Sequence, residues 1–366
     1  MDFSWTPEQQ ALRAEAAAVA ADAVSRYGRS NDSWINGFSK EFSRELGGRG
    51  WIGMTWADNP YSGPARPVID RLIVGEEMIK AGAPIGASWF ADRQMGPALL
   101  AYGTPDQQAA FLPGIVTGES TWCIGMSEPN AGSDLAGLKT SAVREGDMWR
   151  INGQKIWTSF GAVADYCYLI CRTRQDGPPH AGISEIIVPM SAPGIEVRPI
   201  KDMTANRHFC EVFFTDVLVP VENLVGVEGA AFKQTMVQLE HERGGIDRLV
   251  SNYALYRIAA ERADRTDPLI RQEMAALEIG YRVGRILVVR EVLKQAPPGF
   301  SAATKCFCTE HEARVSDFVA RVLGPEAALW DDITRGLAYA PGYTIMGGTS
   351  NVMRNILGER VLGLPR

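Results

Sequence analysis

The sequence predicts an α+β chain of several domains, in which a β-rich middle segment lies between two helical segments. Its 366 residues exceed what one hydrophobic core usually organises. Helix caps and helical periodicity dominate the beginning and the end, whereas short apolar runs separated by turn residues dominate the middle. We therefore predict a helical domain over 1–118, a β domain over 119–226 and a second helical domain over 227–366.

The N-terminal segment carries one helix-start signal twice. Thr6-Pro7-Glu8-Gln9 combines a capping box with proline at the first helical position, and the Ala-rich stretch after it predicts a helix to about Val24. Thr104-Pro105-Asp106-Gln107 repeats the signal. Further helical patterns cover 38–46 and 68–80. Residues 48–53 read Gly-Arg-Gly-Trp-Ile-Gly, but they follow a helical stretch and no βαβ unit surrounds them, so we reject them as a dinucleotide fingerprint.

The middle segment consists of short apolar or alternating runs, which cover 166–173, 183–190, 195–200 and 210–220. Gly, Pro and Asn separate these runs at short intervals, as is typical of a small antiparallel sheet or barrel. After Gly229 helical periodicity returns and persists to Gln295, with a helix end and a new cap at Thr266-Asp267-Pro268. A further helix is predicted from Ser301 to Leu323, where Gly324-Pro325 ends it.

Composition and charge exclude several classes of function. The formal net charge is −6, and no basic run with interleaved aromatic residues indicates a nucleic-acid partner. The six cysteines lack paired C-x-x-C spacing, and the four histidines lack metal-ligand spacing, so we predict no metal site. No apolar run approaches the about 20 residues of a membrane helix, so we predict no membrane partner. The sequence therefore favours a cytoplasmic enzyme in a reducing setting.

The stretch from Ser127 to Asp134, Ser-Glu-Pro-Asn-Ala-Gly-Ser-Asp, offers small residues and backbone N–H groups that can form an anion-binding concavity. Downstream, Asn152-Gly153 predicts a type I′ turn, with strands on either side from Trp149 to Trp157. A phosphate cradle beside a hairpin with an indole suits flavin adenine dinucleotide (FAD). The same residues also suit an ordinary loop and a core tryptophan, and the residues alone leave both interpretations open.

Residues 123–173, CIGMSEPNAGSDLAGLKTSAVREGDMWRINGQKIWTSFGAVADYCYLICRT, resemble the central flavin-binding segment of the acyl-CoA dehydrogenase family. The similarity extends over essentially the whole chain and is strongest in the middle and near the C-terminus. It implies an N-terminal helical domain, a central antiparallel β-barrel-like domain and a C-terminal four-helix bundle. It also implies an FAD cofactor, which carries the hydride chemistry, and the oxidation of an acyl-CoA to the trans-2-enoyl-CoA.

The resemblance assigns cofactor and substrate roles by position. Met126 and Ser127 match residues at the flavin's pyrimidine edge, and Gly132 and Ser133 match residues at the phosphates, with Ser133 also near the CoA tail. The segment that covers the flavin and approaches N5 is matched by Trp157, Thr158 and Ser159. The segment that opens the last helix at the pyrophosphate is matched by Gly347, Gly348, Thr349 and Asn351, which taken alone also suit a plain N-cap.

The reaction requires a carboxylate over the α carbon of the thioester, which takes the α proton while flavin N5 accepts the β hydride. Many family members carry this Glu just before the Gly-Thr of the C-terminal motif, where this chain has Gly347. A minority place it on the first long helix of the C-terminal domain, immediately before an Arg, where this chain has Glu242. The resemblance therefore assigns Glu242 as the base, and it assigns Glu240 and Arg243 to the CoA channel. A solvated helix face is the alternative, although Gly244-Gly245 indicates a close approach to the backbone.

Typical homotetrameric members carry an Arg-x-x-Phe-Gly segment after that helix, which is absent from residues 261–268. In this respect the chain resembles divergent bacterial dehydrogenases that work as α2β2 complexes with a paralogous subunit, several of which act on bulky thioesters such as steroid side chains. An electron-transfer flavoprotein is the expected acceptor. A homo-oligomer, a non-catalytic partner subunit and an oxygen-using oxidase or flavin monooxygenase stay open as alternatives. The sequence does not distinguish straight, branched and steroid-like acyl groups.

Overall fold

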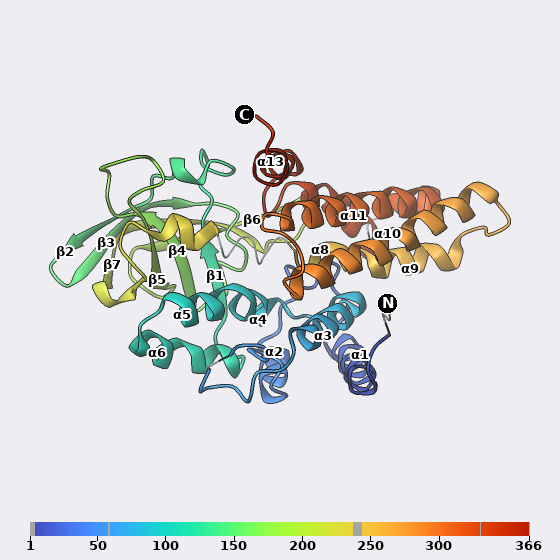
Figure 1. Ribbon diagram of the computed structural model, residues 1–366, viewed down its shortest axis with the longest axis horizontal. Helices are drawn as coiled ribbons and strands as arrows, with labels where there is room; N and C mark the ends of the chain where they lie inside the picture. Colours follow the sequence, from blue (N-terminus) through green and yellow to red (C-terminus); the bar gives the residue numbers. More distant parts are fainter. Residues whose placement is uncertain (1–3, 58, 237–243, 330, 366) are drawn as a thin grey trace. The chain divides into compact units, whose positions relative to one another are not determined.

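The computed structural model describes residues 4–57, 59–236, 244–329 and 331–365 (Figure 1). The chain divides into two compact units. The sheet unit comprises Lys40–Ala65 and Ala87–Leu239, and the helical unit comprises Met1–Ser39, Arg66–Gly86 and Glu240–Arg366. The predicted succession of helical, β-rich and helical segments along the chain is confirmed. The domain boundaries that we placed from the sequence stay a prediction.

The sheet unit contains a mixed sheet of eight strands, with the hydrogen-bonded order β6-β7-β3-β2-β4-β5-β8 and β1 paired to β4. The strands are β1 (Trp122–Gly125), β2 (Ser141–Glu145), β3 (Met148–Lys155), β4 (Tyr166–Arg172), β5 (Ile183–Pro189), β6 (Ile195–Ile200), β7 (Phe209–Pro220) and β8 (Leu224–Val225). β4 is parallel to β1 and to β2, and the other pairs are antiparallel. Among the described strands β6 and β8 do not pair, so the sheet is not a closed barrel. The predicted fold class is confirmed, but its middle domain is a mixed, open sheet instead of a wholly antiparallel, barrel-like one.

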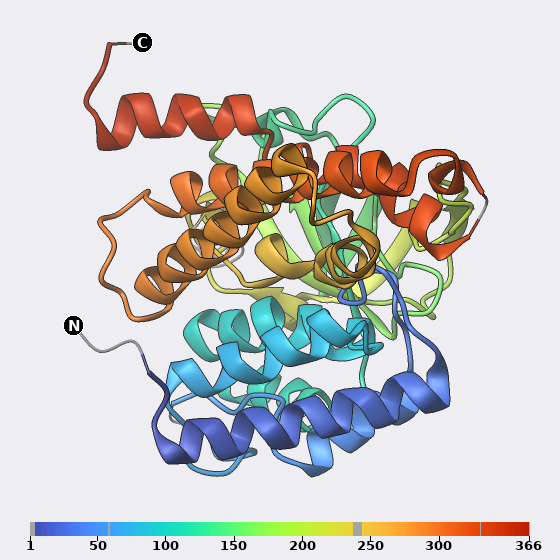
Figure 2. The same cartoon turned by 90° about the vertical axis from the view of Figure 1, so that its right-hand side faces the viewer.

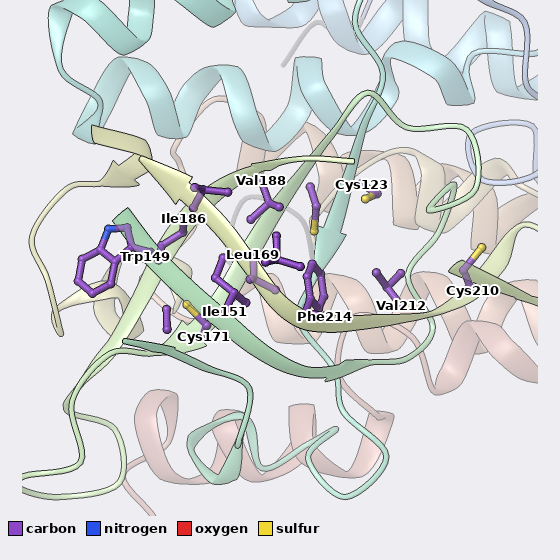
Figure 3. Close-up of a cluster of buried hydrophobic side chains, with 14 residues drawn as sticks. Cys123, Trp149, Ile151, Leu169, Cys171, Ile186, Val188, Cys210, Val212 and Phe214 are labelled. Carbon is purple, nitrogen blue, oxygen red and sulfur yellow. The ribbon is translucent and has the colours of Figure 1, made fainter. Parts of the chain in front are cut away.

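The core of the sheet unit lies on one face of these strands (Figure 3). The buried side chains on this face include Leu169 of β4, Ile186 and Val188 of β5 and Phe214 of β7. Successive side chains of a strand alternate between the two faces, so the residues next to them in sequence point away from this core. Burying one such side chain contributes roughly 1.5–3 kcal/mol. This core therefore fixes the strands from which the loops of the candidate site extend.

The sheet unit contains the helices α2 (Lys40–Gly48), α4 (Gly86–Phe90), whose first residue belongs to the helical unit, α5 (Gly96–Tyr102) and α6 (Pro105–Val116). The capping box predicted at Thr104 is confirmed. Its hydroxyl accepts from the backbone N–H of Gln107 at 3.2 Å, and the side chain of Gln107 accepts from the backbone N–H of Thr104 at 3.0 Å. The amide of Gln107 also donates to the carbonyl of Leu224 at 2.8 Å, which ties α6 to the last strand of the sheet.

The helical unit contains α1 (Pro7–Tyr27), α3 (Val68–Ala81), α8 (Asp247–Val250), α9 (Tyr253–Arg262), α10 (Pro268–Val292), α11 (Ser301–Leu323), α12 (Asp332–Tyr339) and α13 (Ser350–Ile356). The predicted capping box at Thr6, the cap at Asp267 and the helix from Ser301 to Leu323 are confirmed. Figure 2 shows α1, the long dark blue helix, alongside the paler blue α3.

Glycines allow α10 to pack closely in the helical unit. A Cβ atom on Gly280 would lie 2.3 Å from Nδ1 of His311 on α11, and a Cβ atom on Gly284 would lie 2.5 Å from a methyl group of Leu249 on α8. Real side-chain atoms do not approach so closely, so only glycine lets the helices meet at this spacing. These contacts hold α8, α10 and α11 together as one packed group.

Candidate active site

The loop that follows β1 carries the predicted flavin-binding residues, and a buried ion pair holds it to β3. Nζ of Lys155 lies 2.9 Å from Oε1 of Glu128 and donates to the carbonyl of Met126 at 3.0 Å. The side chain of Lys155 is fully buried, and that of Glu128 is 9% exposed. The carboxylate also accepts from the backbone N–H groups of Lys139 at 2.7 Å and Thr140 at 2.8 Å. Lys155 therefore holds both Met126 and Glu128 of this loop in place.

The ionisation of this pair follows from its surroundings. Burial raises the pKa of Glu128, but the ammonium of Lys155 and the N–H donors outweigh it and hold that pKa below its usual value. Burial lowers the pKa of Lys155, and the nearby carboxylate opposes that shift. Neither side chain was predicted from the sequence as part of the site. The signal was present, because Lys155 continues the inward-facing series of Trp149 and Ile151 along β3.

The hairpin predicted at Asn152-Gly153 was wrong. The turn lies at Gly146-Asp147, between the paired residues Glu145 and Met148, and β3 continues through Asn152 to Lys155. The pairing of β3 with β7 shifts register between Ile151 and Gly153, which indicates a bulge. Gly153 has φ 151°, and a Cβ atom on it would lie 2.5 Å from Oγ1 of Thr140. The extra residue of the bulge lies on β7, where three steps oppose two on β3, and Gly153 allows the close approach to Thr140 instead of forming a turn.

The segment after β3 lies beside the first loop. The backbone N–H of Ile156 donates to the carbonyl of Ser127 at 2.9 Å. Thr158 exchanges two backbone hydrogen bonds with Cys210, at 3.0 and 3.1 Å, so the segment is also held to the start of β7. The structure thus brings the segment of Met126 and Ser127 next to the segment of Trp157, Thr158 and Ser159, and their role at one ligand site stays a prediction.

Two features of this segment are unusual for ordinary loop packing. Trp157 has φ 60°, in the left-handed region, and the residue is 55% exposed although its ring packs nearly perpendicular to that of Phe209. A left-handed non-glycine residue costs about 1–2 kcal/mol. Oγ1 of Thr158 is buried and has no hydrogen-bond partner among the described residues. A strained, exposed indole next to a buried hydroxyl without a partner indicates that this surface receives a ligand.

Gly132 and Ser133 lie in the exposed part of the first loop. Glu128 and Ala131 exchange two backbone hydrogen bonds of 3.0 Å, which close a tight turn just before them. A Cβ atom on Gly132 would meet nothing within 4 Å, so packing within the described residues does not require glycine at this position. The space around its backbone is open to an approaching group.

In the helical unit, Gly347 and Gly348 have φ 65° and 91°, which favour glycine at both positions. Thr349 is the N-cap of α13, because its hydroxyl accepts from the backbone N–H of Val352 at 3.2 Å. A Cβ atom on Gly348 would lie 2.5 Å from Cε of Met353. Asn351 is exposed in the first turn of the helix. The predicted base Glu242 and its neighbours Glu240 and Arg243 lie outside the described residues.

Three family models match consecutive parts of the chain. They are described as the N-terminal, middle and C-terminal domains of acyl-CoA dehydrogenases, and they match residues 6–119, 123–217 and 232–362. A relative in Mycobacterium tuberculosis, the acyl-CoA dehydrogenase IpdE1, is 34% identical over 342 residues, which cover 89% of this chain and 88% of that protein. The chain belongs to the acyl-CoA dehydrogenase family.

This acyl-CoA dehydrogenase is also similar to solved structures of the family along its full length. The Tcur3481-Tcur3483 steroid ACAD is 30% identical, with a TM-score of 0.89 and complete coverage of both chains. The ChsE4-ChsE5 complex from Mycobacterium tuberculosis is 32% identical, with a TM-score of 0.87 and complete coverage of both chains. Members of the family are flavoprotein oxidoreductases that act on acyl-CoA thioesters. Within the described part of this chain, no helix combines the length and apolar character needed to cross a membrane.

Proposed function

We propose that this acyl-CoA dehydrogenase binds FAD and oxidises its acyl-CoA substrate between Cα and Cβ to the trans-2-enoyl-CoA. The observation that carries the proposal is the joined pair of segments at Met126-Ser127 and Trp157–Ser159, with its exposed indole and its buried hydroxyl without a partner. When bound, FAD supplies the acceptor for the hydride. The residues fit that cofactor because a flat ring can cover the indole and a ring nitrogen or oxygen can bond to Oγ1 of Thr158.

The chain's own residues bind and orient in this proposal. Met126 and Ser127 contact the pyrimidine edge, and the ion pair between Lys155 and Glu128 keeps their backbone groups in place. Gly132 and Ser133 offer backbone N–H groups to phosphate oxygens, where open space surrounds the glycine. In the helical unit, we propose that the segment of Gly347, Gly348, Thr349 and Asn351 binds the pyrophosphate.

We propose Glu242 as the base that takes the α proton. Gly347 stands where many relatives carry their base, and its φ of 65° favours glycine, so the chain needs a carboxylate from another position. Glu240 and Arg243 are proposed to line the CoA channel. The same proposal makes this chain the catalytic subunit of its complex, with an electron-transfer flavoprotein as the electron acceptor.

The test uses the purified full-length chain, its flavin content and its reduction by CoA thioesters without oxygen. We expect about one FAD per chain and bleaching of the flavin by at least one member of a panel of straight, branched and steroid-like thioesters. Glu242→Gln should retain FAD and reduce the rate of bleaching by about 10²- to 10⁴-fold, as expected when a general base is removed. Glu222→Gln is the control, because Glu222 is exposed in the turn before β8.

Each other outcome identifies an alternative. A chain without FAD that acquires activity only with a second subunit is a non-catalytic partner. Peroxide production with oxygen in place of reduction of an electron-transfer flavoprotein indicates an oxidase or monooxygenase. Normal bleaching by Glu242→Gln contradicts the assignment of the base and leaves the cofactor proposal intact.

A stripe of exposed apolar side chains on α10 supports an oligomer. The stripe consists of residues that are between 39% and 77% exposed, namely Leu269, Ile279, Val283 and Ile286 of α10 and Leu293 at its C-cap. From Ile279 onward their spacing of four, three and seven residues places them on one side of the helix. Large exposed apolar surfaces of this kind mark interaction sites.

We propose that a second copy of this chain covers this stripe. A two-fold axis level with residue 281 would set Leu269 opposite Leu293 and Ile279 opposite Val283 of the second copy, so the stripe is self-complementary in an antiparallel pair. Such a pair fits both a homo-oligomer and an α2β2 complex. Light scattering of the chain alone should give at least a dimer, and Ile279→Glu with Val283→Glu should give a monomer. Val143→Glu is the control, because Val143 is an exposed apolar residue of β2, away from the stripe in sequence. A wild-type chain that is monomeric in solution would contradict the proposal.

A further inference from the structure

A network of buried polar side chains lies in the helical unit, next to the segment that leads to Gly347-Gly348-Thr349. It joins Asp32, which follows α1, to Asn252 at the start of α9, Glu312 of α11 and Tyr343 after α12. All four side chains are at most 1% exposed. Within the described residues neither carboxyl group forms an ion pair with a cation, and both Oδ2 of Asp32 and Oε1 of Glu312 lack a hydrogen-bond partner.

The hydrogen bonds require a proton on Asp32. The hydroxyl of Tyr343 lies within hydrogen-bond distance of Oδ1 of Asp32 and, at 3.1 Å, of Oδ1 of Asn252. The amide nitrogen of Asn252 faces the backbone carbonyl of Glu312 at 3.4 Å, which fixes the orientation of the amide. A hydroxyl carries a single proton, so it cannot donate to both oxygens. An ionised Asp32 accepts the proton of the tyrosine, and the bond to Asn252 is then lost. Both bonds form together only when a protonated Asp32 donates to the hydroxyl oxygen.

The surroundings agree with neutral acids. Glu312 accepts from the backbone N–H of Asn252 at 2.6 Å, and burial raises its pKa well above the usual value. Burial raises the pKa of Asp32 to about 7, although hydrogen bonds from Tyr343 and Ser251 oppose the shift. The titratable groups on the elements packed around the network include Asp247 and Arg248 of α8, Tyr256 of α9, Tyr281 of α10, Lys305, Cys308 and His311 of α11, and Tyr339 of α12.

Tyr343 is held at both ends. Nζ of Lys305 donates to its backbone carbonyl at 3.2 Å, while Asp32 and Asn252 bind its hydroxyl. The chain then turns, with backbone hydrogen bonds from Ile345 and Met346 to Gly342 at 3.0 and 2.9 Å, and reaches Gly347 four residues after the tyrosine. The position of the tyrosine ring therefore sets where the two glycines begin.

We propose that Asp32, Asn252, Glu312 and Tyr343 are positioning residues, which hold the segment before Gly347 in place as long as Asp32 carries its proton. The effect on the cofactor rests on the proposed function, because it assumes that Gly347, Gly348 and Thr349 bind FAD. The effect on the segment itself does not rest on it. The two consequences are therefore measured separately.

The first measurement is hydrogen–deuterium exchange of residues 344–349 in the full-length chain without added FAD. Tyr343→Phe removes the shared hydroxyl, and the loss of a hydrogen bond of about 1–1.5 kcal/mol predicts roughly tenfold faster exchange. Tyr256→Phe is the matched control, because Tyr256 is buried in the same unit and its hydroxyl donates to Glu278 at 2.8 Å, remote in sequence from the segment. Equal exchange in the two variants would overturn the proposal.

The second measurement is FAD affinity between pH 6 and pH 9, followed by quenching of flavin fluorescence. Wild-type affinity should fall as the pH rises above about 7, whereas Asp32→Asn should give a flat profile, since its amide donates to Tyr343 at every pH. Identical pH profiles for the two proteins would overturn the proposal. If wild type binds no FAD, the proposed function fails and the exchange experiment still decides the role of the network. Asp32→Asn retains a donor, so it also serves if Tyr343→Phe does not fold.

Discussion

Replacing Lys155 with Met tests whether the buried ion pair of the sheet unit holds the first loop. The substitution keeps the volume of the side chain and leaves the carboxylate of Glu128 without its cation. Removing one partner of a buried pair costs about 3–5 kcal/mol. The lower end applies here, because Glu128 keeps its bonds from Lys139 and Thr140 at 2.7 and 2.8 Å and is 9% exposed. We therefore expect Lys155→Met to lower the free energy of unfolding by about 3 kcal/mol.

Urea unfolding of the full-length chain, followed by far-UV circular dichroism, measures this loss. Glu128→Gln in the same background should recover part of it, because the unpaired charge is then removed and the two backbone N–H groups keep an acceptor. Arg150→Met is the control. Arg150 lies on the same strand and pairs with Glu145 at 2.7 Å, but both side chains are at the surface, so its unfolding curve should stay close to that of wild type. If Lys155→Met behaves like Arg150→Met, or if the double variant is less stable than the single one, the reasoning is refuted.

Three further predictions concern the helical unit. Burial raises the pKa of Asp32 to about 7, so its neutral form contributes its full stabilisation below the usual pKa of an aspartate. As the pH rises from there towards 7, the free energy of unfolding should fall by up to about 1.4 kcal/mol per pH unit. Asp32→Asn should flatten this part of the curve of stability against pH. Gly348→Ala should lower the melting temperature, since φ 91° is strained for alanine and the new Cβ meets Met353; an unchanged value would contradict this geometry. Thr349→Ala should cost about 1 kcal/mol in urea unfolding through loss of the N-cap, and Thr349→Ser should restore it.

The parts of the fold that the sequence predicted correctly depend on local chemistry. The caps at Thr6, Thr104 and Asp267 involve residues at most three positions apart, so a short stretch of sequence is enough to predict each of them. The position of a hairpin is less local. Gly146-Asp147 and Asn152-Gly153 both suit a two-residue turn, and the choice between them depends on the pairing of β3 with β7, about 60 residues further along the chain.

Whether the sheet closes, and which strands run parallel, also depends on pairs of strands that are far apart in the sequence. The parallel contact of β1 with β4 joins Trp122 to Tyr166, and alternating hydrophobicity does not show which strands will be neighbours. The same applies to the candidate site. The family resemblance identified the segments at Met126 and Trp157, whereas the buried pair that joins them was missed because charged residues on a strand are usually expected at its surface.

Two of the buried carboxyl groups next to the proposed cofactor segments, Glu128 and Asp32, limit the protein on opposite sides of an intermediate pH. The pKa of Glu128 is lowered mainly by Lys155 against the effect of burial, so its contribution to stability is present above the usual pKa and is lost as the pH falls through the lowered value. The pKa of Asp32 is raised by burial, so its contribution is lost as the pH rises. FAD affinity should therefore fall on both sides of an intermediate pH even in Glu242→Gln, which lacks the proposed base. If the FAD affinity of Glu242→Gln did not change with pH on either side, the pH dependence would belong to the proposed base and not to Glu128 and Asp32.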